Sequence, residues 1–135
     1  MTSPMFISID LGTTGNRAIA FNLQGQSIAS SYAEFTQSFP SPGWVEHDPM
    51  EILQSTFRVL SKVLSKVPPS SVQGLCITNQ RETTIIWDKK TGIPIYPAIV
   101  WQCKRTTQRC MELKHSEDLF QKKTGLRIDP YFSAT

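Results

Sequence analysis

The sequence has few cysteines, no long apolar run and little net charge, and each shortage excludes a class of protein. Three cysteines in 135 residues, an odd number without CxxC spacing, argue against a disulfide scaffold and against a cysteine metal site. We therefore expect reduced thiols and a cytoplasmic protein. No apolar stretch approaches the roughly 20 residues that a membrane helix needs, and the N-terminus shows no secretory leader. A net charge of +3, dispersed along the chain, does not favour nucleic acid as a partner.

What remains is the composition of an ordinary globular protein. Hydrophobic residues make up 39% of the chain and charged residues 19%. A chain of 135 residues is one domain's worth and can bury about two thirds of its unfolded surface. The densest basic stretch has helical spacing and acidic neighbours, so we expect a solvated face at Lys104, Arg105, Arg109 and Lys114.

The hydrophobic pattern predicts a meander of three strands, a crossover helix and further strands. We expect strands at residues 6–10, 17–21, 27–35, 72–77 and 84–88, with a short apolar segment at 98–101. Residues 39–44 contain two prolines and should form an irregular loop, while 106–113 and 118–123 have helical character, the latter ended by Gly125. This order predicts an α/β protein with a mixed sheet and flanking helices, without internal repeats or an interdomain linker.

The crossover helix has clear boundary signals. Asp48 is a good N-cap, Pro49 suits the first helical position, and Glu51 is spaced for a capping box. A proline pair at 68–69 ends the pattern. We expect the core to contain Phe6, Phe21 and one apolar stripe of the helix, formed by Leu53, Phe57, Leu60, Leu64 and Val67.

The turn after the first strand is a candidate phosphate-binding element. Asp10 can hold Mg²⁺ through waters, because this ion gives up its hydration shell reluctantly. Gly12 allows close backbone approach to a phosphate, and the hydroxyls of Thr13 and Thr14 can point into the same concavity. Arg17 can offset phosphate charge. A plain hairpin is the alternative, because Asp and Gly are common turn formers and the GxxxxGK[ST] pattern is absent.

A second candidate site follows the strand at 72–77. Arg81 can donate hydrogen bonds to hydroxyl oxygens of a small polyol, and Glu82 can accept from its hydroxyl hydrogens. Trp101 can cover the C–H face of such a ligand, and Tyr131 can offer its hydroxyl. The alternatives are a surface Arg–Glu pair and aromatic residues that only pack. Phosphoryl transfer is the reaction that needs both sites, and we expect them to converge on one crevice.

Taken together, these stretches resemble the N-terminal part of the glycerol kinases, a branch of the carbohydrate-kinase family named for its FGGY signature. The resemblance rests on residues 10–14 (DLGTT) with Arg17, 42–49 (PGWVEHDP), 78–84 (TNQRETT), 98–102 (AIVWQ), 124–126 (TGL) and 129–133 (DPYFS). Gly15 and Asn16 depart from the family pattern, which has a serine-rich pair there.

The resemblance implies an actin-like ATPase (ribonuclease H-like) fold, with residues 1–135 as the N-terminal part of the first of two lobes. It implies that ATP or ADP contacts Thr13, Thr14, Gly15 and Arg17, with Asp10 near Mg²⁺. It also implies a glycerol pocket lined by Arg81, Glu82, Trp101 and Tyr131. The family's catalytic Asp is expected downstream, so no catalytic residue is assigned in this chain.

The expected reaction is the phosphorylation of glycerol by ATP to sn-glycerol 3-phosphate, with glycerol and ATP/ADP as ligands and a homo-oligomer as the full-length protein. Two alternatives stay open. The parent protein can be a kinase for another polyol or a ketose of the same family. The chain can also be a non-catalytic module that binds a ligand or assembles with partners, and by itself it is expected to be inactive.

Overall fold

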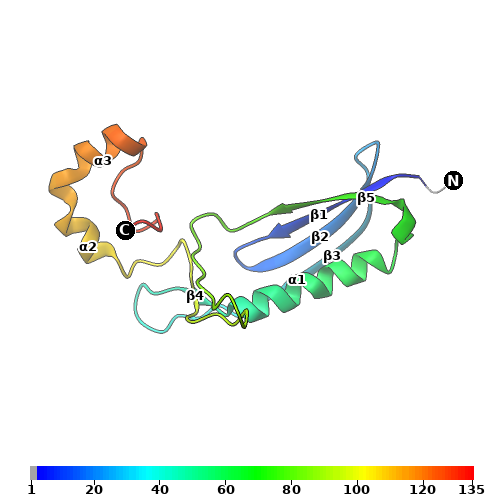
Figure 1. Ribbon diagram of the computed structural model, residues 1–135, viewed down its shortest axis with the longest axis horizontal. Helices are drawn as coiled ribbons and strands as arrows, with labels where there is room; N and C mark the ends of the chain where they lie inside the picture. Colours follow the sequence, from blue (N-terminus) through cyan, green and yellow to red (C-terminus); the bar gives the residue numbers. More distant parts are fainter. Residues whose placement is uncertain (1–2) are drawn as a thin grey trace. The chain divides into compact units, whose positions relative to one another are not determined.

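The computed structural model describes residues 3–135, which form two compact units. The first unit contains residues 3–36 and Asp48–Gln80, and the second contains Gln37–His47 and Arg81–Thr135. Figure 1 shows a sheet with one long helix in the first unit and short helices with loops in the second.

The first unit is built on a four-stranded mixed sheet in the order β3-β2-β1-β5. Its strands are β1 (Met5–Leu11), β2 (Gly15–Asn22), β3 (Ser27–Glu34) and β5 (Val72–Thr78). The first three are antiparallel neighbours, whereas β5 pairs with β1 in parallel. This arrangement confirms the predicted meander and mixed sheet. A parallel pair needs a crossover connection, which the helix α1 (Pro49–Leu64) provides.

The start of α1 follows the predicted N-cap but not the predicted capping box. The Asp48 carboxylate accepts a hydrogen bond from the Met50 N–H at 2.8 Å, and Pro49 occupies the first turn. Glu51 instead accepts from the N–H and the hydroxyl of Thr36, at 3.1 and 3.2 Å. The capping box is therefore wrong, because Thr36 brings two donors to the same carboxylate oxygen. Pro69 begins a short 3-10 turn, η1 (Pro69–Ser71), instead of ending the helix directly.

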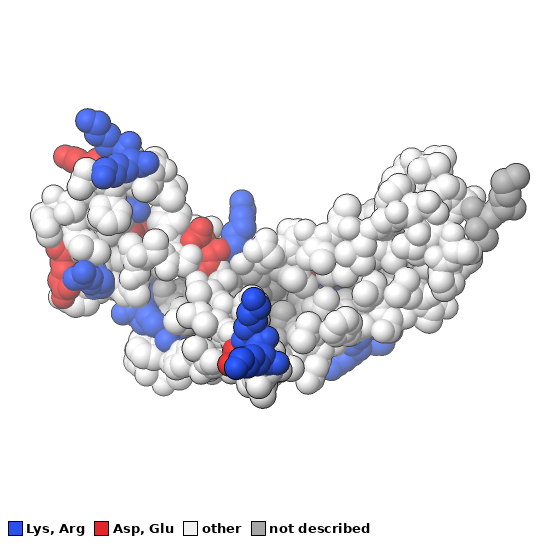
Figure 2. All heavy atoms as spheres, viewed as in Figure 1, with Lys and Arg blue, Asp and Glu red and all other residues white. Residues whose placement is uncertain are grey.

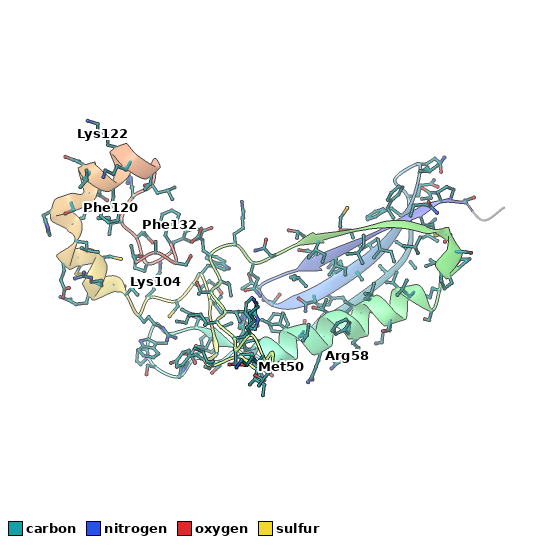
Figure 3. All side chains as sticks on the ribbon, viewed as in Figure 1. Met50, Arg58, Lys104, Phe120, Lys122 and Phe132 are labelled. Carbon is teal, nitrogen blue, oxygen red and sulfur yellow. The ribbon has the colours of Figure 1, made fainter. Side chains whose placement is uncertain are left out.

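The core of the first unit lies between α1 and one face of the sheet. Val59 and Val63 are fully buried against a sheet face that carries Ile7, Ile9, Ala18, Ala20 and Ala29. Figure 3 shows Arg58 pointing from α1 away from the sheet. The alanines leave shallow space on the sheet, and the compact β-branched valines fit it.

The predicted core stripe of the helix is therefore partly wrong. Leu53 and Phe57 are 45% and 59% exposed, and Phe6 is 42% exposed on the opposite sheet face. Val67 is buried, and Leu60 and Leu64 pack against the core as predicted. The buried face of the first turns of α1 carries polar residues such as Ser55, so the pattern of hydrophobic residues could not predict it.

That polar face is tied to the sheet by one buried side chain. The Asn16 amide nitrogen in β2 donates to the Ile52 carbonyl at 2.9 Å and to the hydroxyls of Ser55 and Thr56 at 2.6 and 2.9 Å. Asn16 and Ser55 are almost completely buried. These hydrogen bonds compensate the burial of the amide nitrogen and of the two hydroxyls, whereas the buried Asn16 Oδ1 has no described partner. The helix packs here through polar side chains.

The second unit contains little regular structure. It has β4 (Glu46–His47) paired with β6 (Ala98–Ile99), and then α2 (Thr107–Glu112), η2 (Lys114–Ser116) and α3 (Glu117–Thr124). Both predicted helices are confirmed, and Gly125 ends α3 with a φ of 76°. None of the described helices has the length and apolar character of a membrane span.

The strand predicted at 84–88 is wrong. Thr84 and Trp87 make only isolated bridges, to Ile99 and Pro94. The facing segment contains Pro94 and Pro97, which have no N–H to donate to a ladder. The segment therefore folds back on itself with too few hydrogen bonds to form a strand.

The solvated face predicted at the basic stretch is correct for Lys104, Arg109 and Lys114, which are exposed, and wrong for Arg105. Arg109 and Lys114 have side chains 61% and 63% exposed and pair with Glu112 and Glu117. Side chains of both signs gather over α2 and α3 on the face shown in Figure 2. The side chain of Arg105 is only 13% exposed and bonds the Glu46 carboxylate at 2.6 Å. The partner is distant in sequence, so local charge patterning could not find it.

Arg105 lies at the centre of a cluster of interacting side chains in the second unit. Its other members are Trp44, Glu46, Tyr96 and Cys103. The guanidinium carbon lies 3.9 Å from the centroid of the Trp44 ring, and Nε donates to the Cys103 sulfur at 3.0 Å. The Tyr96 hydroxyl donates to the same Glu46 oxygen at 3.3 Å. Burial opposes ionisation of Cys103, but the hydrogen bond from Arg105 and backbone hydrogen bonds outweigh it, and the pKa of this thiol is lowered.

Candidate functional site

The turn between β1 and β2 is held by backbone contacts and by the end of β5. The Gly12 N–H donates to the Gly15 carbonyl at 3.1 Å, and the Gln80 amide donates to the Gly12 carbonyl at 2.8 Å. A Cβ at Gly12 would lie 2.7 Å from the Gly15 oxygen, and one at Gly15 would lie 2.6 Å from the Ala33 oxygen. A side chain at either position would therefore force neighbouring backbone to shift, within the turn for position 12 and in β3 for position 15.

The predicted phosphate-site residues lie around this turn. Asp10 and Arg17 are direct cross-strand partners, so their side chains share the sheet face opposite α1. Thr13 and Thr14 form the bend between the strands. The carboxyl ends of β1 and β5 meet here, which is the edge where open α/β sheets bind ligands.

Sequence reasoning missed one residue beside the turn, Tyr32 in β3. Its hydroxyl lies 3.3 Å from the Thr14 hydroxyl, and its ring centroid lies 5.4 Å from the guanidinium carbon of Arg17. Tyr32 is the cross-strand partner of Arg17. Only the register of β2 against β3 makes this contact, and no local motif signals it.

The surroundings of Asp10 bear on the expected Mg²⁺. Asp10 is an exposed carboxylate at the end of a strand. Among the described residues there is no group of three or more metal-ligating side chains. A single exposed carboxylate can hold a hydrated Mg²⁺ only together with other oxygen ligands such as those of a phosphate, which is how this ion is commonly bound.

The second unit contains a hollow of about 180 Å³ that collects three of the four predicted polyol residues. Glu82, Trp101 and Tyr131 line it. The rings of Trp101 and Tyr131 meet edge to face, with centroids 5.7 Å apart and planes at 65°. Arg81 is exposed and is not among the residues that line this hollow.

Glu82 has an unusual backbone and a fixed carboxylate. Its φ of 63° is in the left-handed region, where residues other than glycine are uncommon. Its Oε2 accepts from the N–H and the hydroxyl of Ser133, at 2.9 and 2.8 Å. The Ser133 backbone bond, and then its side-chain bond, lower the pKa of Glu82. The carboxylate is therefore ionised and oriented before any ligand arrives.

Ser133 is a further residue of this hollow that no site prediction named. The sequence feature that could have identified it is its place in the DPYFS motif at 129–133, where Asp129 also accepts from the Tyr131 N–H at 2.8 Å.

The turn between β1 and β2 belongs to the first unit, and the hollow belongs to the second. Their convergence on one crevice stays a prediction.

Comparison with known proteins relates this chain to sugar kinases. It is 51% identical to the glycerol kinase of Halothermothrix orenii over 139 residues, covering 100% of this chain and 28% of that protein. It is 52% identical to the glycerol kinase of Bacillus subtilis over 133 residues, covering 96% of this chain and 27% of that protein. The chain thus spans little more than a quarter of the length of these relatives.

Solved structures of sugar kinases also have a fold similar to that of this chain. The glycerol kinase of Plasmodium falciparum, crystallised with ADP, aligns with a TM-score of 0.85 and 34% identity, over 98% of this chain and 27% of that one. The xylulose kinase of Rhodospirillum rubrum aligns with a TM-score of 0.84 and 26% identity, over 92% of this chain and 26% of that one. The predicted actin-like ATPase fold is confirmed.

The model of the FGGY family of carbohydrate kinases, N-terminal domain, matches residues 5–135. The match covers nearly the whole chain and includes both the turn at Gly12 and the hollow at Glu82. This chain therefore belongs to the FGGY family of carbohydrate kinases.

Proposed function

We propose that this chain is the N-terminal part of an ATP-dependent glycerol kinase, which converts glycerol and ATP into sn-glycerol 3-phosphate and ADP. The observation that carries the proposal is the hollow in which the fixed Glu82 carboxylate lies with Trp101 and Tyr131. The identity of about half the residues to glycerol kinases supports the choice of acceptor.

The hollow has the chemistry of a small polyol site. An ionised carboxylate accepts hydrogen bonds from hydroxyl groups, and both Ser133 bonds fall on Oε2, so Oε1 can face the ligand. The faces and edges of the Trp101 and Tyr131 rings suit the C–H groups of glycerol. Arg81, next to Glu82, donates to a hydroxyl oxygen when its exposed side chain turns toward the ligand. A site that bonds hydroxyl groups rejects ligands that lack them.

The turn in the first unit is the proposed nucleotide site. Thr13, Thr14 and the Gly15 backbone contact the phosphates of ATP or ADP, and Arg17 offsets their charge. Asp10 holds Mg²⁺ through water, and the ion neutralises phosphate charge when bound. Phosphoryl transfer depends mostly on positioning and charge stabilisation, which these residues supply. We assign no general base within this chain and expect it downstream.

The setting of the complete protein is part of the proposal. All three cysteines are free thiols, with Cys103 and Cys110 buried, which suits a cytoplasmic enzyme. We also propose that the full-length protein is a homo-oligomer, which light scattering on that protein tests.

A kinase for a ketose or another polyol is the second candidate. The likeness to xylulose kinase, with a TM-score of 0.84, favours it, because the same fold accepts a longer substrate in that protein. Assays of the full-length protein with ATP and glycerol, erythritol or xylulose decide between the two. Preferred turnover of xylulose would overturn the glycerol assignment.

The roles of the individual residues are tested in the same enzyme. Arg81→Ala should raise the KM for glycerol roughly tenfold or more, the scale of a hydrogen bond to a charged group. Lys122→Ala, which removes an exposed cation from α3, is the matched control and should change nothing (Figure 3). An unchanged KM in Arg81→Ala would remove that residue from the site. The 135-residue chain alone should show no turnover.

A further inference from the structure

We infer that Tyr32 is a positioning residue of the nucleotide site, which orients Thr14 through its hydroxyl and Arg17 through its ring. The inference rests on the proposed function, because it adds a residue to the turn assigned to ATP. Tyr32 contributes no charge and no metal ligand, and its effect passes through the two side chains that it touches.

The strand register places Tyr32 at this point. Tyr32 in β3 is the cross-strand partner of Arg17 in β2, and Arg17 is in turn the partner of Asp10 in β1. The three side chains form a row on the sheet face opposite α1, next to the turn. The described ion pairs do not include one between Arg17 and Asp10, so the Tyr32 ring is the described contact that orients the guanidinium.

The contact leaves Arg17 able to bind an anion. A guanidinium held over an aromatic face keeps its N–H groups at its edge, where a phosphate oxygen can accept from them. Arg otherwise samples many rotamers, and holding it in place before the ligand arrives reduces the entropy lost on binding. The hydroxyl of Tyr32, 3.3 Å from that of Thr14, restricts the second side chain in the same way.

Gly15 provides the space for this arrangement. A Cβ at position 15 would lie 2.7 Å from the Tyr32 hydroxyl oxygen and 2.8 Å from the ring carbon that bears it. Any side chain at position 15 would push the ring away from the turn. The sequence thus combines a glycine in the turn with a tyrosine on the neighbouring strand, and the phenol fills the room that the glycine leaves.

The test uses the full-length protein that contains this chain, with two variants of Tyr32. Tyr32→Phe keeps the ring and removes the hydroxyl, and Tyr32→Leu removes both. We expect the KM for ATP to rise about threefold in Tyr32→Phe, the scale of one modest hydrogen bond, and about tenfold in Tyr32→Leu. The KM for glycerol should stay within a factor of about two, since that site lies elsewhere in the chain. Ile28→Ala, an exposed residue of the same strand, is the control and should leave both constants unchanged.

A coupling measurement separates positioning from a structural role. In an Arg17→Ala background, Tyr32→Leu should weaken ATP binding no more than Tyr32→Phe, because the ring then has no guanidinium to orient. An unchanged KM for ATP in both Tyr32 variants would overturn the inference. So would equal rises for ATP and glycerol together with a lowered Tm, which would indicate general loss of structure. Tyr32→Phe conserves the volume of the ring and keeps the test valid if Tyr32→Leu does not fold.

The inference and the proposed function fail in different ways. If the wild-type protein does not phosphorylate glycerol, the function is wrong, and calorimetry with MgADP still tests Tyr32. Weaker ADP binding by both variants would then support the positioning role. Equal ADP binding by wild type and variants, or no ADP binding by the wild type, would overturn it.

Discussion

Replacing Glu46 by glutamine should destabilise the second unit by about 3 kcal/mol, because it leaves the buried charge of Arg105 without a counterion. The two side chains are only 13% and 9% exposed and lie 2.6 Å apart. Removing one partner of a buried pair costs about 3–5 kcal/mol, and the residual exposure together with the hydrogen bonding of glutamine places this variant at the lower end. The stacking of Arg105 on Trp44 remains in the variant, so the measured decrease in the free energy of unfolding reports on the Arg105–Glu46 ion pair.

Urea denaturation followed by tryptophan fluorescence measures this effect in the right part of the chain. All three tryptophans, Trp44, Trp87 and Trp101, belong to the second unit. With a slope of about 1 kcal/mol per molar urea, typical of a small unit, the midpoint should fall by about 3 M. If the free energy of unfolding of the wild-type unit is smaller than this loss, the variant should already be unfolded without urea.

Two further variants make the prediction decisive. Glu112→Gln breaks an ion pair with Arg109 whose side chains are 51% and 61% exposed, and it should cost under about 1 kcal/mol. The double variant Glu46→Leu with Arg105→Met, which replaces both charges by apolar groups, should recover most of the stability lost in Glu46→Gln. A midpoint shift in Glu46→Gln as small as that of Glu112→Gln would refute the reasoning.

Three other predictions concern the core and the hollow. Val63→Ala should cost about 2 kcal/mol in urea denaturation and Phe57→Ala under about 1, because Val63 is fully buried and Phe57 is 59% exposed; equal losses would contradict the packing described. Asn16→Ala should cost about 2–3 kcal/mol, since it removes three hydrogen bonds that join the sheet to α1, and a neutral result would show that water replaces them. Ser133→Ala removes the hydroxyl bond to Glu82 and keeps the backbone N–H bond, so it should raise the pKa of Glu82 only part of the way toward its ordinary value of 4.5, measured by NMR titration, and an unmoved pKa would contradict the contribution of the hydroxyl. Since the folded pKa is lowered, the stability that these bonds contribute is present above the ordinary value and is lost as the pH falls through the lowered pKa.

The sequence by itself determined the elements whose signals are local. Asp48 and Pro49 mark the start of α1, and Gly125 marks the end of α3. The alternation of apolar residues and the short turns gave the antiparallel meander, and a helix between two apolar strands implied the parallel pair. These features depend on neighbours within a few residues, where backbone geometry and capping act directly.

Short sequence motifs also predicted most of the candidate site residues. Three of the four residues expected for the polyol pocket line one hollow, and the residues expected for phosphate lie around one turn. Their roles in binding remain predictions, which the Arg81 variant tests for the polyol pocket.

Only the tertiary structure decided which surfaces meet. The buried face of α1 is set by the alanines and Asn16 beneath it, so a strong apolar stripe on the helix pointed partly to the wrong side. Tyr32 reaches Thr14, Ser133 reaches Glu82 and Arg105 reaches Glu46 across separations of 18, 51 and 59 residues. Such contacts depend on strand register and chain reversal, and the side chains involved carry no local pattern that distinguishes a buried partner from a solvated one.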